Sequence, residues 1–298
     1  MSNVQTINAK RVDLYPSRVS EKPSLLDRKD PVVHGNHSKD SLLTPEQLDF
    51  YEKNGYIFLE SFFSEDEVAE LRKEADRLRE NVRKSSADEI IREPNGNEVR
   101  SIFAIHREKG AFEDISAHPR LRNVVENILG SDVYVHQSRI NFKPGFTGKE
   151  FYWHSDFETW HVEDGMPRMR ALSCSIALEE NFHYNGPLMV VPGSHKKFIS
   201  CVGQTPDDHY KESLRKQEYG VPDHDSLTKM VDEAGIEAPT GKAGSVVIFD
   251  CNTMHGSNSN ITPKSRNNVF MVFNSVENKL EEPFSGKKPR PGYIGTRD

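Results

Sequence analysis

The chain has 298 residues, and its 39 Lys and Arg against 46 Asp and Glu give a net charge of −7 at pH 7. Nucleic-acid-binding domains usually carry a basic surplus, so this balance argues against a nucleic-acid partner. No stretch approaches the roughly 18 consecutive apolar residues of a membrane-spanning helix, and no apolar leader is evident, which argues against a membrane partner. Three cysteines without a CxxC pair form no disulfide framework, so a cytoplasmic location is expected.

Residues 1–40 contain three prolines and scattered charges without periodicity, which predicts an extended N-terminal arm, loosely ordered. We interpret residues 41–298 as a single domain. A polar, charged stretch at about 203–240 interrupts this domain and is predicted to be an insertion with a helix over 226–234.

Three helices are predicted in the first half of the domain. Thr44 and Gln47 form a capping box that opens the first helix, and Ser64 and Glu67 form a second capping box. Apolar residues at helical spacing follow Ser64, which predicts an amphipathic helix. The third predicted helix covers 119–129 and ends at a glycine.

The rest of the domain consists mainly of short β-like runs separated by turn residues. The predicted strands cover 56–59, 133–142, 151–156, 170–178, 188–191, 245–249 and 268–274. Because helices do not alternate with these strands, the pattern favours an antiparallel sandwich or barrel. The predicted fold class is therefore mainly β with flanking helices.

A candidate metal site begins with His154 and Asp156, which lie two residues apart in the predicted strand 151–156. Residues at this spacing point to one face of a strand, so an imidazole and a carboxylate are expected to converge. A distant histidine would complete the two-His, one-carboxylate set that leaves open positions on Fe(II). Chance also produces such a tripeptide in a chain of this composition, so the pattern alone establishes no site.

Four histidines are candidates for the third ligand: His161, His183, His195 and His255. His255 is favoured because it follows an apolar strand and opens a turn. Arg266 lies 11 residues later, at the start of the next apolar strand, and can hold a carboxylate there with two hydrogen bonds. A metal with open positions and a carboxylate clamp are what a 2-oxoglutarate-dependent oxygenase requires.

Several blocks, in order, resemble the phytanoyl-CoA dioxygenase family of Fe(II)/2-oxoglutarate oxygenases: NGYIFLESFFSEDEVAELRKE, HSD, NGPLMVVPGSH and GSVVIFDCNTMHGSNSN. The resemblance covers about 45–275 and implies a double-stranded β-helix, the jelly-roll core also found in cupins. The block over 135–195, PSR at 16–18 and RSIFAIH at 100–106 are similar to the ectoine hydroxylase branch of that family. That similarity implies hydroxylation of ectoine to 5-hydroxyectoine, with release of succinate and CO2, in protection against osmotic stress.

The resemblance also implies roles for single residues. His154, Asp156 and His255 would be catalytic as the ligands of Fe(II), with 2-oxoglutarate and O2 as cosubstrates. The residues implied to bind 2-oxoglutarate are Arg266, Ser257, Asn141 and Phe151. Those implied to bind ectoine are Gln137, Trp160, Asn268 and Phe249. The resemblance further suggests a homodimer.

Alternatives remain open at this stage. One is a related hydroxylase of proline, of another free amino acid or of an acyl group, although the charged segment after Trp160 does not predict an extended apolar groove. Another is a jelly-roll protein that holds metal without turnover. A third is a zinc hydrolase, because two histidines and an aspartate also suit Zn²⁺. Trp160, Phe151 and Phe249 have the further alternative of ordinary core packing.

Overall fold

The computed structural model describes residues 12–36, 40–93, 97–214 and 219–297. Its strands are β1 (Ser24–Asp27), β2 (Tyr56–Leu59), β3 (Ile90–Arg92), β4 (Val99–Phe103), β5 (Val133–Lys143), β6 (Phe151–His154), β7 (Ala171–Ala177), β8 (Leu188–Val190), β9 (Lys197–Ser200), β10 (Val246–Asp250), β11 (His255–Ser257) and β12 (Arg266–Ser275). Its helices are α1 (Pro45–Asn54), α2 (Glu65–Asn81), α3 (Ala111–Ser116), α4 (Pro119–Leu129), α5 (Asp156–Thr159), α6 (Tyr210–Ser213) and α7 (His224–Ala234).

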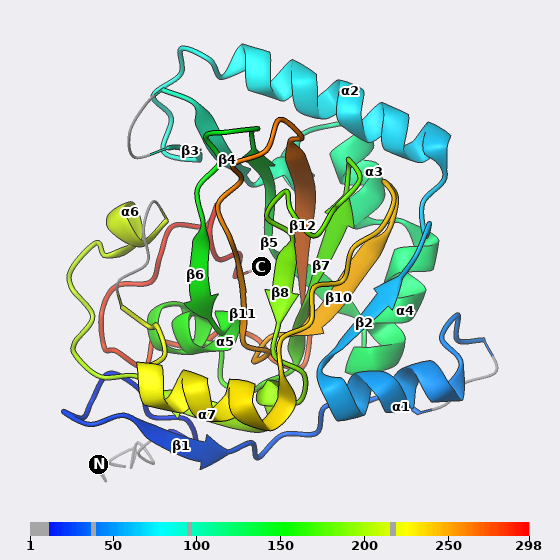
Figure 1. Ribbon diagram of the computed structural model, residues 1–298. Helices are drawn as coiled ribbons and strands as arrows, with labels where there is room; N and C mark the ends of the chain where they lie inside the picture. The colour runs from blue at the N-terminus through cyan, green and yellow to red at the C-terminus, as the bar shows by residue number, and fades with distance from the viewer. Residues whose placement is uncertain (1–11, 37–39, 94–96, 215–218, 298) are drawn as a thin grey trace, which may run out of the picture.

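Two antiparallel sheets form the centre of the molecule. The larger sheet has the strand order β2-β10-β7-β12-β5-β4-β3, and the smaller has the order β6-β11-β8. In Figure 1 the smaller sheet stands in front of β5, β12 and β7. The prediction of a mainly β fold with flanking helices is confirmed.

The two faces of the large sheet differ in polarity because side chains alternate along each strand. On β5, Ile140 and Phe142 point into the main hydrophobic core, which also contains apolar residues of α2 and α4. The alternate residues Asn141 and Lys143 are buried as well, so they must lie on the opposite, inner face. This polar inner face, turned toward the small sheet, is where a site can form.

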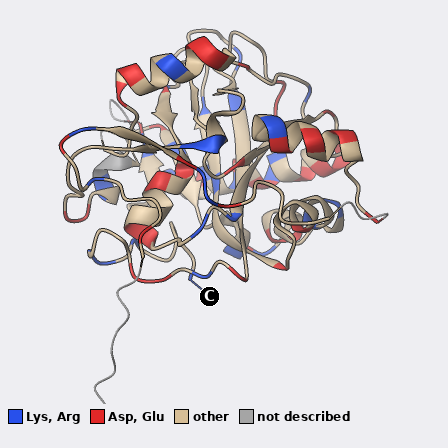
Figure 2. Ribbon diagram, turned by 90° about the horizontal axis from the view of Figure 1, so that it is seen from below, with Lys and Arg blue, Asp and Glu red and all other residues tan. Residues whose placement is uncertain are grey.

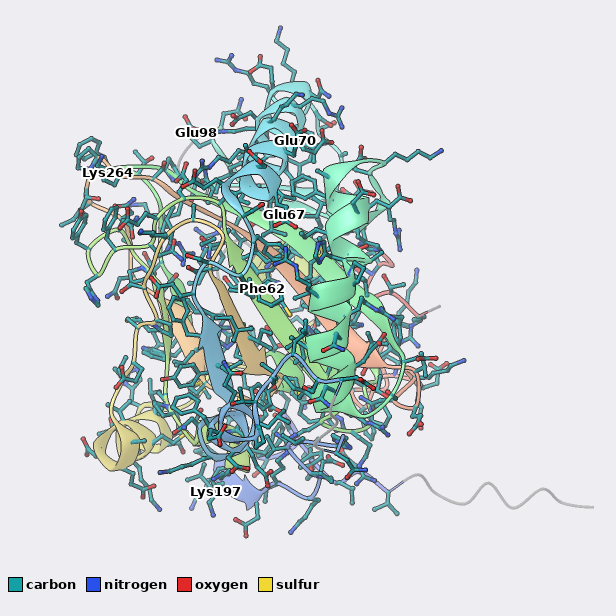
Figure 3. All side chains as sticks on the ribbon, turned by 90° about the vertical axis from the view of Figure 1, so that its right-hand side faces the viewer. Phe62, Glu67, Glu70, Glu98, Lys197 and Lys264 are labelled. Carbon is teal, nitrogen blue, oxygen red and sulfur yellow. The ribbon has the colours of Figure 1, made fainter. Side chains whose placement is uncertain are left out.

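The predicted helix starts are confirmed. Thr44 caps α1 and Ser64 caps α2, each with the reciprocal bond of a capping box. Glu67 at the start of α2 also accepts hydrogen bonds from Arg120 of α4, whose guanidinium donates to the carbonyl of Phe62. Figure 3 shows Glu67 and Phe62 on the side where α2 meets the sheet. These contacts attach the two covering helices to each other and to the core.

The N-terminal residues that the structure describes are ordered against the domain. Tyr15 is 0% exposed and Arg18 is 4% exposed. Strand β1 pairs with β9, and the Arg18 guanidinium donates to both carboxylate oxygens of Glu158. The expectation of a loosely ordered arm is therefore wrong for residues 12–36, because a buried ion pair and a strand pairing fix them. Residues 1–11 and 37–39 lie outside the described part.

Positions of basic and acidic residues are interspersed along the helices in the ribbon of Figure 2. Among the described residues, no helix combines the length and the apolar character needed to cross a membrane. The predicted helix inside the polar stretch 203–240 is present as α7, which Asp223 caps.

Candidate metal and cosubstrate site

Two imidazoles and a carboxylate converge between the two sheets. His154 ends β6, His255 begins β11 and Asp156 begins α5. Nε2 of His154 lies 3.7 Å from Oδ1 of Asp156, and Nε2 of His255 lies 3.9 Å from Oδ2 of the same carboxylate. One ligand atom from each residue lies within 4.8 Å of the others. With metal–ligand bonds of about 2.0–2.2 Å, donors at this spacing fit around one divalent ion.

The backbone fixes the protonation of both histidine rings. Nδ1 of His154 lies 2.7 Å from the carbonyl oxygen of Tyr152, and Nδ1 of His255 lies 2.9 Å from that of Thr253. Since a carbonyl oxygen only accepts, Nδ1 carries the proton and Nε2 keeps its lone pair for a metal. Burial lowers the pKa of both rings, that of His154 to about 4, so both are neutral at pH 7.

The predicted strand 151–156 is two residues shorter in the structure. Strand β6 ends at His154, and the Ser155 hydroxyl accepts the N–H of Glu158 as the N-cap of α5. The assumption that His154 and Asp156 share one strand face is therefore wrong. A serine N-cap begins the helix at Asp156, and this change of direction brings the carboxylate to the two imidazoles.

Asp156 supplies the anionic ligand of the cluster. The Ser173 hydroxyl of β7 donates to its Oδ2 at 3.0 Å. Burial alone would raise the pKa of Asp156, but the imidazoles of His255 and His154 and the guanidinium of Arg139 outweigh burial and lower it. Asp156 is therefore ionised at neutral pH, as a metal ligand must be.

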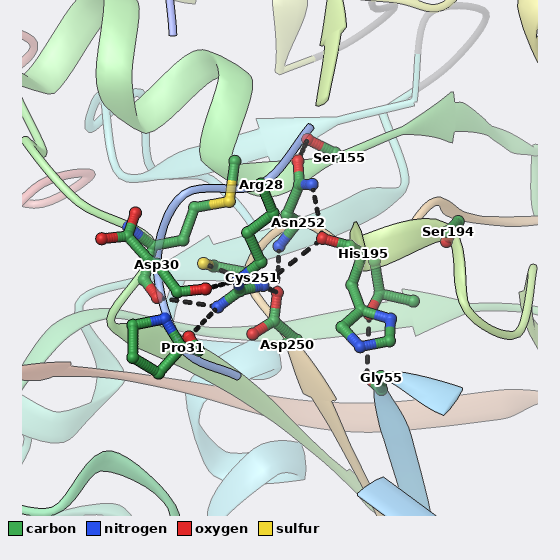
Figure 4. Close-up of polar contacts among 12 residues, drawn as sticks. Arg28, Asp30, Pro31, Gly55, Ser155, Ser194, His195, Asp250, Cys251 and Asn252 are labelled. Carbon is green, nitrogen blue, oxygen red and sulfur yellow. Dashed lines mark hydrogen bonds and ion pairs between the residues drawn. The ribbon is translucent and has the colours of Figure 1, made fainter. Parts of the chain in front are cut away.

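A buried polar network, drawn in Figure 4, holds the turn between the first two ligands. Arg28 pairs with Asp250 at 2.7 Å, and the same carboxylate oxygen accepts the N–H of Asn252 at 2.8 Å. The Asn252 amide oxygen accepts the Ser155 hydroxyl at 3.1 Å, and its NH2 group donates to the carbonyl of His195 at 3.0 Å. The N-cap between the ligands is thus tied to the turn that leads into β11.

Arg266 carries a buried positive charge with no carboxylate within ion-pair distance among the described residues. It begins β12 and is 1% exposed, and its Nε and Nη1 have no hydrogen-bond acceptor among the described residues. Burial lowers its pKa to about 10, so it stays charged at neutral pH. A buried charge without a counterion is costly. The residue therefore fits a ligand carboxylate, such as the distal carboxylate of 2-oxoglutarate, which can accept hydrogen bonds from its guanidinium.

A polar group around Lys143 adjoins Arg266. Lys143 is its Cα partner in the β5–β12 pairing and donates from Nζ to the Ser257 hydroxyl oxygen at 2.7 Å. Burial is the main cause that lowers the pKa of Lys143 well below its usual range, and the positive charge of Arg266 is the second. Asn141 lies two residues earlier on β5 and is 2% exposed. Ser257 and Asn141 thus lie beside Lys143 or on its strand face, and their role in binding 2-oxoglutarate stays a prediction.

Phe151 lies under a second arginine at this end of the site. The Arg100 guanidinium is 3.8 Å from the Phe151 ring centroid, and the Lys143 ammonium is 5.4 Å from it. Arg100 is paired with buried Glu93 at 3.1 Å. Its charge is therefore balanced within the protein, whereas those of Arg266 and Lys143 have no described carboxylate within ion-pair distance.

Two amides predicted to bind the substrate lie on β5 and β12. Gln137 donates from Nε2 to the carbonyl of Ile294 at 2.7 Å and accepts a hydrogen bond from Arg139. Asn268 donates to the Ser175 hydroxyl at 2.9 Å, and its Oδ1 is buried without a partner. Because buried polar atoms are rarely left unsatisfied, that oxygen is suited to accept an N–H group from a ligand.

The two aromatic residues predicted on the substrate side lie in different surroundings. Phe249 is 0% exposed, and its ring centroid is 4.7 Å from that of His255. Trp160 is 2% exposed and follows α5 in a π-helical turn, with its ring edge-on to His136 at 5.2 Å. Phe249 thus contacts the metal cluster directly, whereas Trp160 packs in a buried apolar cluster. The roles of both in ligand binding stay predictions.

Arg139 and Lys143 of β5 also belong to this site, although neither is among the residues predicted for it. Gln137, Arg139, Asn141 and Lys143 occupy every second position of β5, so all four polar side chains lie on its inner face. The intervening Ile140 belongs to the main core. Polar residues at every second position over 137–143 indicate a strand with one polar face, and in this structure that face is buried.

The other candidate third ligands are placed elsewhere. The ring of His161 bonds Asp13 at 2.9 Å, and that of His195 lies 3.1 Å from the carbonyl of Glu52. His183 is an exposed loop residue. Within the part of the chain that the structure describes, only His255 joins the pair His154 and Asp156 in a metal-binding arrangement.

The comparisons with known proteins cover nearly the whole chain. The family model for phytanoyl-CoA dioxygenase (PhyH) matches residues 51–268. An ectoine dioxygenase of Bordetella bronchiseptica is 57% identical over 285 residues, which are 96% of this chain and 92% of the relative.

Two solved structures are also very similar. The crystal structure of EctD from S. alaskensis with 2-oxoglutarate and 5-hydroxyectoine has a TM-score of 0.88 at 50% identity, over 96% of this chain and 95% of that one. The same enzyme with bound Fe has a TM-score of 0.86 at 49% identity, over the same shares. The family model covers well over half of the sequence, and the metal cluster lies within it. This chain belongs to the phytanoyl-CoA dioxygenase family.

Proposed function

We propose that this chain is an Fe(II)- and 2-oxoglutarate-dependent dioxygenase that hydroxylates ectoine to 5-hydroxyectoine, a reaction of compatible-solute synthesis under osmotic stress. The observation that carries the proposal is the combination of the His154–Asp156–His255 cluster with the buried guanidinium of Arg266, in which Nε and Nη1 find no acceptor in the described part of the chain. The relatives named ectoine dioxygenase, and the EctD structure with 2-oxoglutarate and 5-hydroxyectoine, support the choice of substrate.

In this reaction the residues of the protein would position the metal ion, the cosubstrates and the substrate. When bound, Fe(II) together with 2-oxoglutarate and O2 supplies the oxidising power that inserts oxygen into a C–H bond and converts 2-oxoglutarate to succinate and CO2. His154 and His255 would hold the ion through Nε2, the atoms that their fixed tautomers leave free. Three protein ligands leave the remaining coordination positions to the cosubstrates.

The cationic end of the site would orient 2-oxoglutarate. Arg266 would bind the distal carboxylate through its buried guanidinium, in which Nε and Nη1 have no acceptor among the described residues. Lys143 already donates to the Ser257 oxygen, so the hydroxyl proton of Ser257 is available for a second bond to that carboxylate. Because the Arg266 cation is buried, its attraction for a dianion is weakly screened.

The other end of the inner face suits a small zwitterion better than an acyl chain. Ectoine carries a carboxylate and a delocalised cationic ring, and Arg139 is a half-buried cation with no described carboxylate within ion-pair distance. Arg139 would pair with the ectoine carboxylate, and the orphan Oδ1 of Asn268 would accept a ring N–H. The aromatic face of Trp160 would then stabilise the cationic ring.

The location and the assembly of the enzyme belong to the same proposal. All three cysteines are buried and unpaired, which supports a reducing, cytoplasmic location. A homodimer remains a prediction from the resemblance, and light scattering of the purified protein tests it directly.

The deciding experiment supplies purified protein with Fe(II), 2-oxoglutarate, O2 and ectoine, and measures succinate and hydroxylated product. Equimolar succinate and 5-hydroxyectoine are expected, with neither formed when oxygen or Fe(II) is left out. Coupled turnover of proline but not of ectoine would instead identify a related amino-acid hydroxylase. Binding of Fe(II) without any succinate would identify a metal-binding protein, and oxygen-independent chemistry with Zn²⁺ would identify a hydrolase.

A further inference from the structure

The end of the chain packs against the substrate side of the site. In Figure 1 the red C-terminal part runs on the same side of the molecule as α5 and α6. We infer that the segment Arg290–Thr296 is a positioning element for the substrate, which holds the amide of Gln137 and, through it, the guanidinium of Arg139. This inference rests on the proposed function, because it takes Gln137 and Arg139 to face ectoine.

Two hydrogen bonds join this C-terminal segment to the middle of β5. The Gln137 side chain donates from Nε2 to the carbonyl of Ile294 at 2.7 Å. The backbone N–H of Thr296 donates to the carbonyl of His136 at 2.8 Å. Ile294 is 0% exposed, so this contact is sealed from water. The rotamer of Gln137 is therefore set by a residue more than 150 positions later in the chain.

A buried ion pair anchors the same segment beside Trp160. Arg290 donates from Nε and Nη2 to the two carboxylate oxygens of Asp164, at 2.7 and 2.6 Å. Asp164 ends the π-helical turn that begins at Trp160, and Nε2 of His136 lies 3.3 Å from its Oδ2. Burial would raise the pKa of Asp164, but Arg290 outweighs it and holds that pKa well below its usual range.

The fit around Asp164 leaves no space at Gly295. A Cβ atom on Gly295 would meet Cγ of Asp164 at 2.9 Å and both carboxylate oxygens at 3.0 Å. The carboxylate cannot move aside easily, since Arg290 holds it at both oxygens. At Gly292, in the same segment, the nearest atom to an added Cβ is Nη2 of Arg107 at 3.9 Å. The two glycines therefore differ in what an added methyl group displaces.

The consequence for the substrate passes through Gln137. Its Oε1 accepts a hydrogen bond from Arg139, while its Nε2 is held by Ile294. If the segment shifts, the amide loses its acceptor and Arg139 loses a fixed partner. None of the residues placed at the metal or the 2-oxoglutarate clamp bonds to this segment among the described contacts, so only the substrate side is affected.

The test compares Gly295→Ala with Gly292→Ala in the full-length protein. For Gly295→Ala the KM for ectoine should rise about 3- to 10-fold, the effect of losing one hydrogen bond. The KM for 2-oxoglutarate, the affinity for Fe(II) and the slow decay of 2-oxoglutarate without ectoine should stay at wild-type values. Gly292→Ala should behave as wild type in all four measurements.

A second pair of variants covers the case in which Gly295→Ala does not fold. Arg290→Gln breaks the ion pair and should raise the ectoine KM, and Arg290→Lys, which keeps the charge, should restore part of the loss. An unchanged ectoine KM, or equal increases for ectoine and 2-oxoglutarate, would overturn the inference while leaving the proposed function intact. A wild-type protein that does not turn over ectoine would overturn both.

Discussion

His154 and His255 face each other directly across the antiparallel strands β6 and β11. Their Cα atoms are register partners, and their ring centroids are 4.3 Å apart. Each ring also bonds through Nδ1 to the carbonyl of the residue two positions earlier in its own strand or turn, Tyr152 or Thr253. Backbone pairing therefore sets both the separation and the tautomer of the two ligands, which makes the metal site rigid before any ion binds.

Replacing His255 with alanine should abolish both Fe(II) binding and turnover, because two remaining donors cannot hold the ion against water. Anaerobic titration with Fe(II), followed by isothermal calorimetry, measures the binding. His183→Ala is the matched control, since that exposed histidine lies outside the cluster. Tight Fe(II) binding by the His255 variant would show that another residue is the third ligand.

The sequence predicted His255 correctly as the partner of the HSD tripeptide but misjudged how Asp156 joins it. Spacing identifies which residues share a strand face only while the strand continues, and β6 ends at His154, two residues before Asp156. The serine between the ligands carried the missing information as a helix N-cap. After Ser155 the chain follows the period of a helix and not that of a strand.

Contacts that depend on distant parts of the chain could not be predicted in this way. The bond from Gln137 to Ile294 and the pair of Arg28 with Asp250 join segments separated by 157 and 222 positions. No local pattern marks them, because each partner is an ordinary residue of a loop or strand. The order of residues 12–36 was missed for the same reason.

Replacing Arg266 with methionine should separate stability from cosubstrate binding. The KM for 2-oxoglutarate should rise about 10- to 100-fold, the range for a charged hydrogen bond lost from a buried site. The ligand-free protein should melt at the same or a higher temperature, because an uncompensated buried charge is replaced by an apolar chain of similar length.

Lys264→Met is the control for the methionine variant, since Lys264 is exposed two residues earlier and lies at the surface in Figure 3. Its KM for 2-oxoglutarate should match that of wild type. A large loss of thermal stability in Arg266→Met would instead mean that Arg266 has a structural partner and is no clamp.

Replacing Asn252 with alanine should weaken iron binding without touching a ligand. Asn252 holds the Ser155 hydroxyl and the carbonyl of His195, so the N-cap that places Asp156 loses its support. Loss of such an outer partner typically lowers metal affinity by about 10- to 100-fold. Asn54→Ala is the control, because among the described contacts the side-chain amide of Asn54 bonds just the carbonyl of Phe50 in its own helix. Equal Fe(II) affinities for the two variants would show that the network is not needed.

Acid should destabilise the protein partly through His195. Burial lowers the pKa of His195 to about 4, against an ordinary value of about 6.5 in the unfolded chain. Below pH 6.5 the His195 imidazole is protonated in the unfolded state but stays neutral in the folded state. The contribution of His195 to the free energy of unfolding is therefore complete above pH 6.5 and is lost as the pH falls toward 4. Urea midpoints at pH 7.5 and pH 5 should therefore differ less in His195→Gln than in wild type. The exposed His224→Gln should keep the wild-type difference, and parallel losses in all three proteins would refute this assignment.

Trp160 offers the sharpest separation between packing and substrate binding. If its ring stabilises the cationic part of ectoine, Trp160→Ala should raise the ectoine KM by about 2- to 30-fold, the range of a cation–π contact. The decay of 2-oxoglutarate without ectoine should persist, because Trp160 touches neither the ligands nor the clamp in the described contacts. Trp160→Phe keeps an aromatic face and should lie between alanine and wild type. If ectoine hydroxylation and the decay of 2-oxoglutarate without ectoine fall together, in proportion to the loss of thermal stability, Trp160 is a core residue beside His136. The cationic ring of ectoine would then be bound elsewhere.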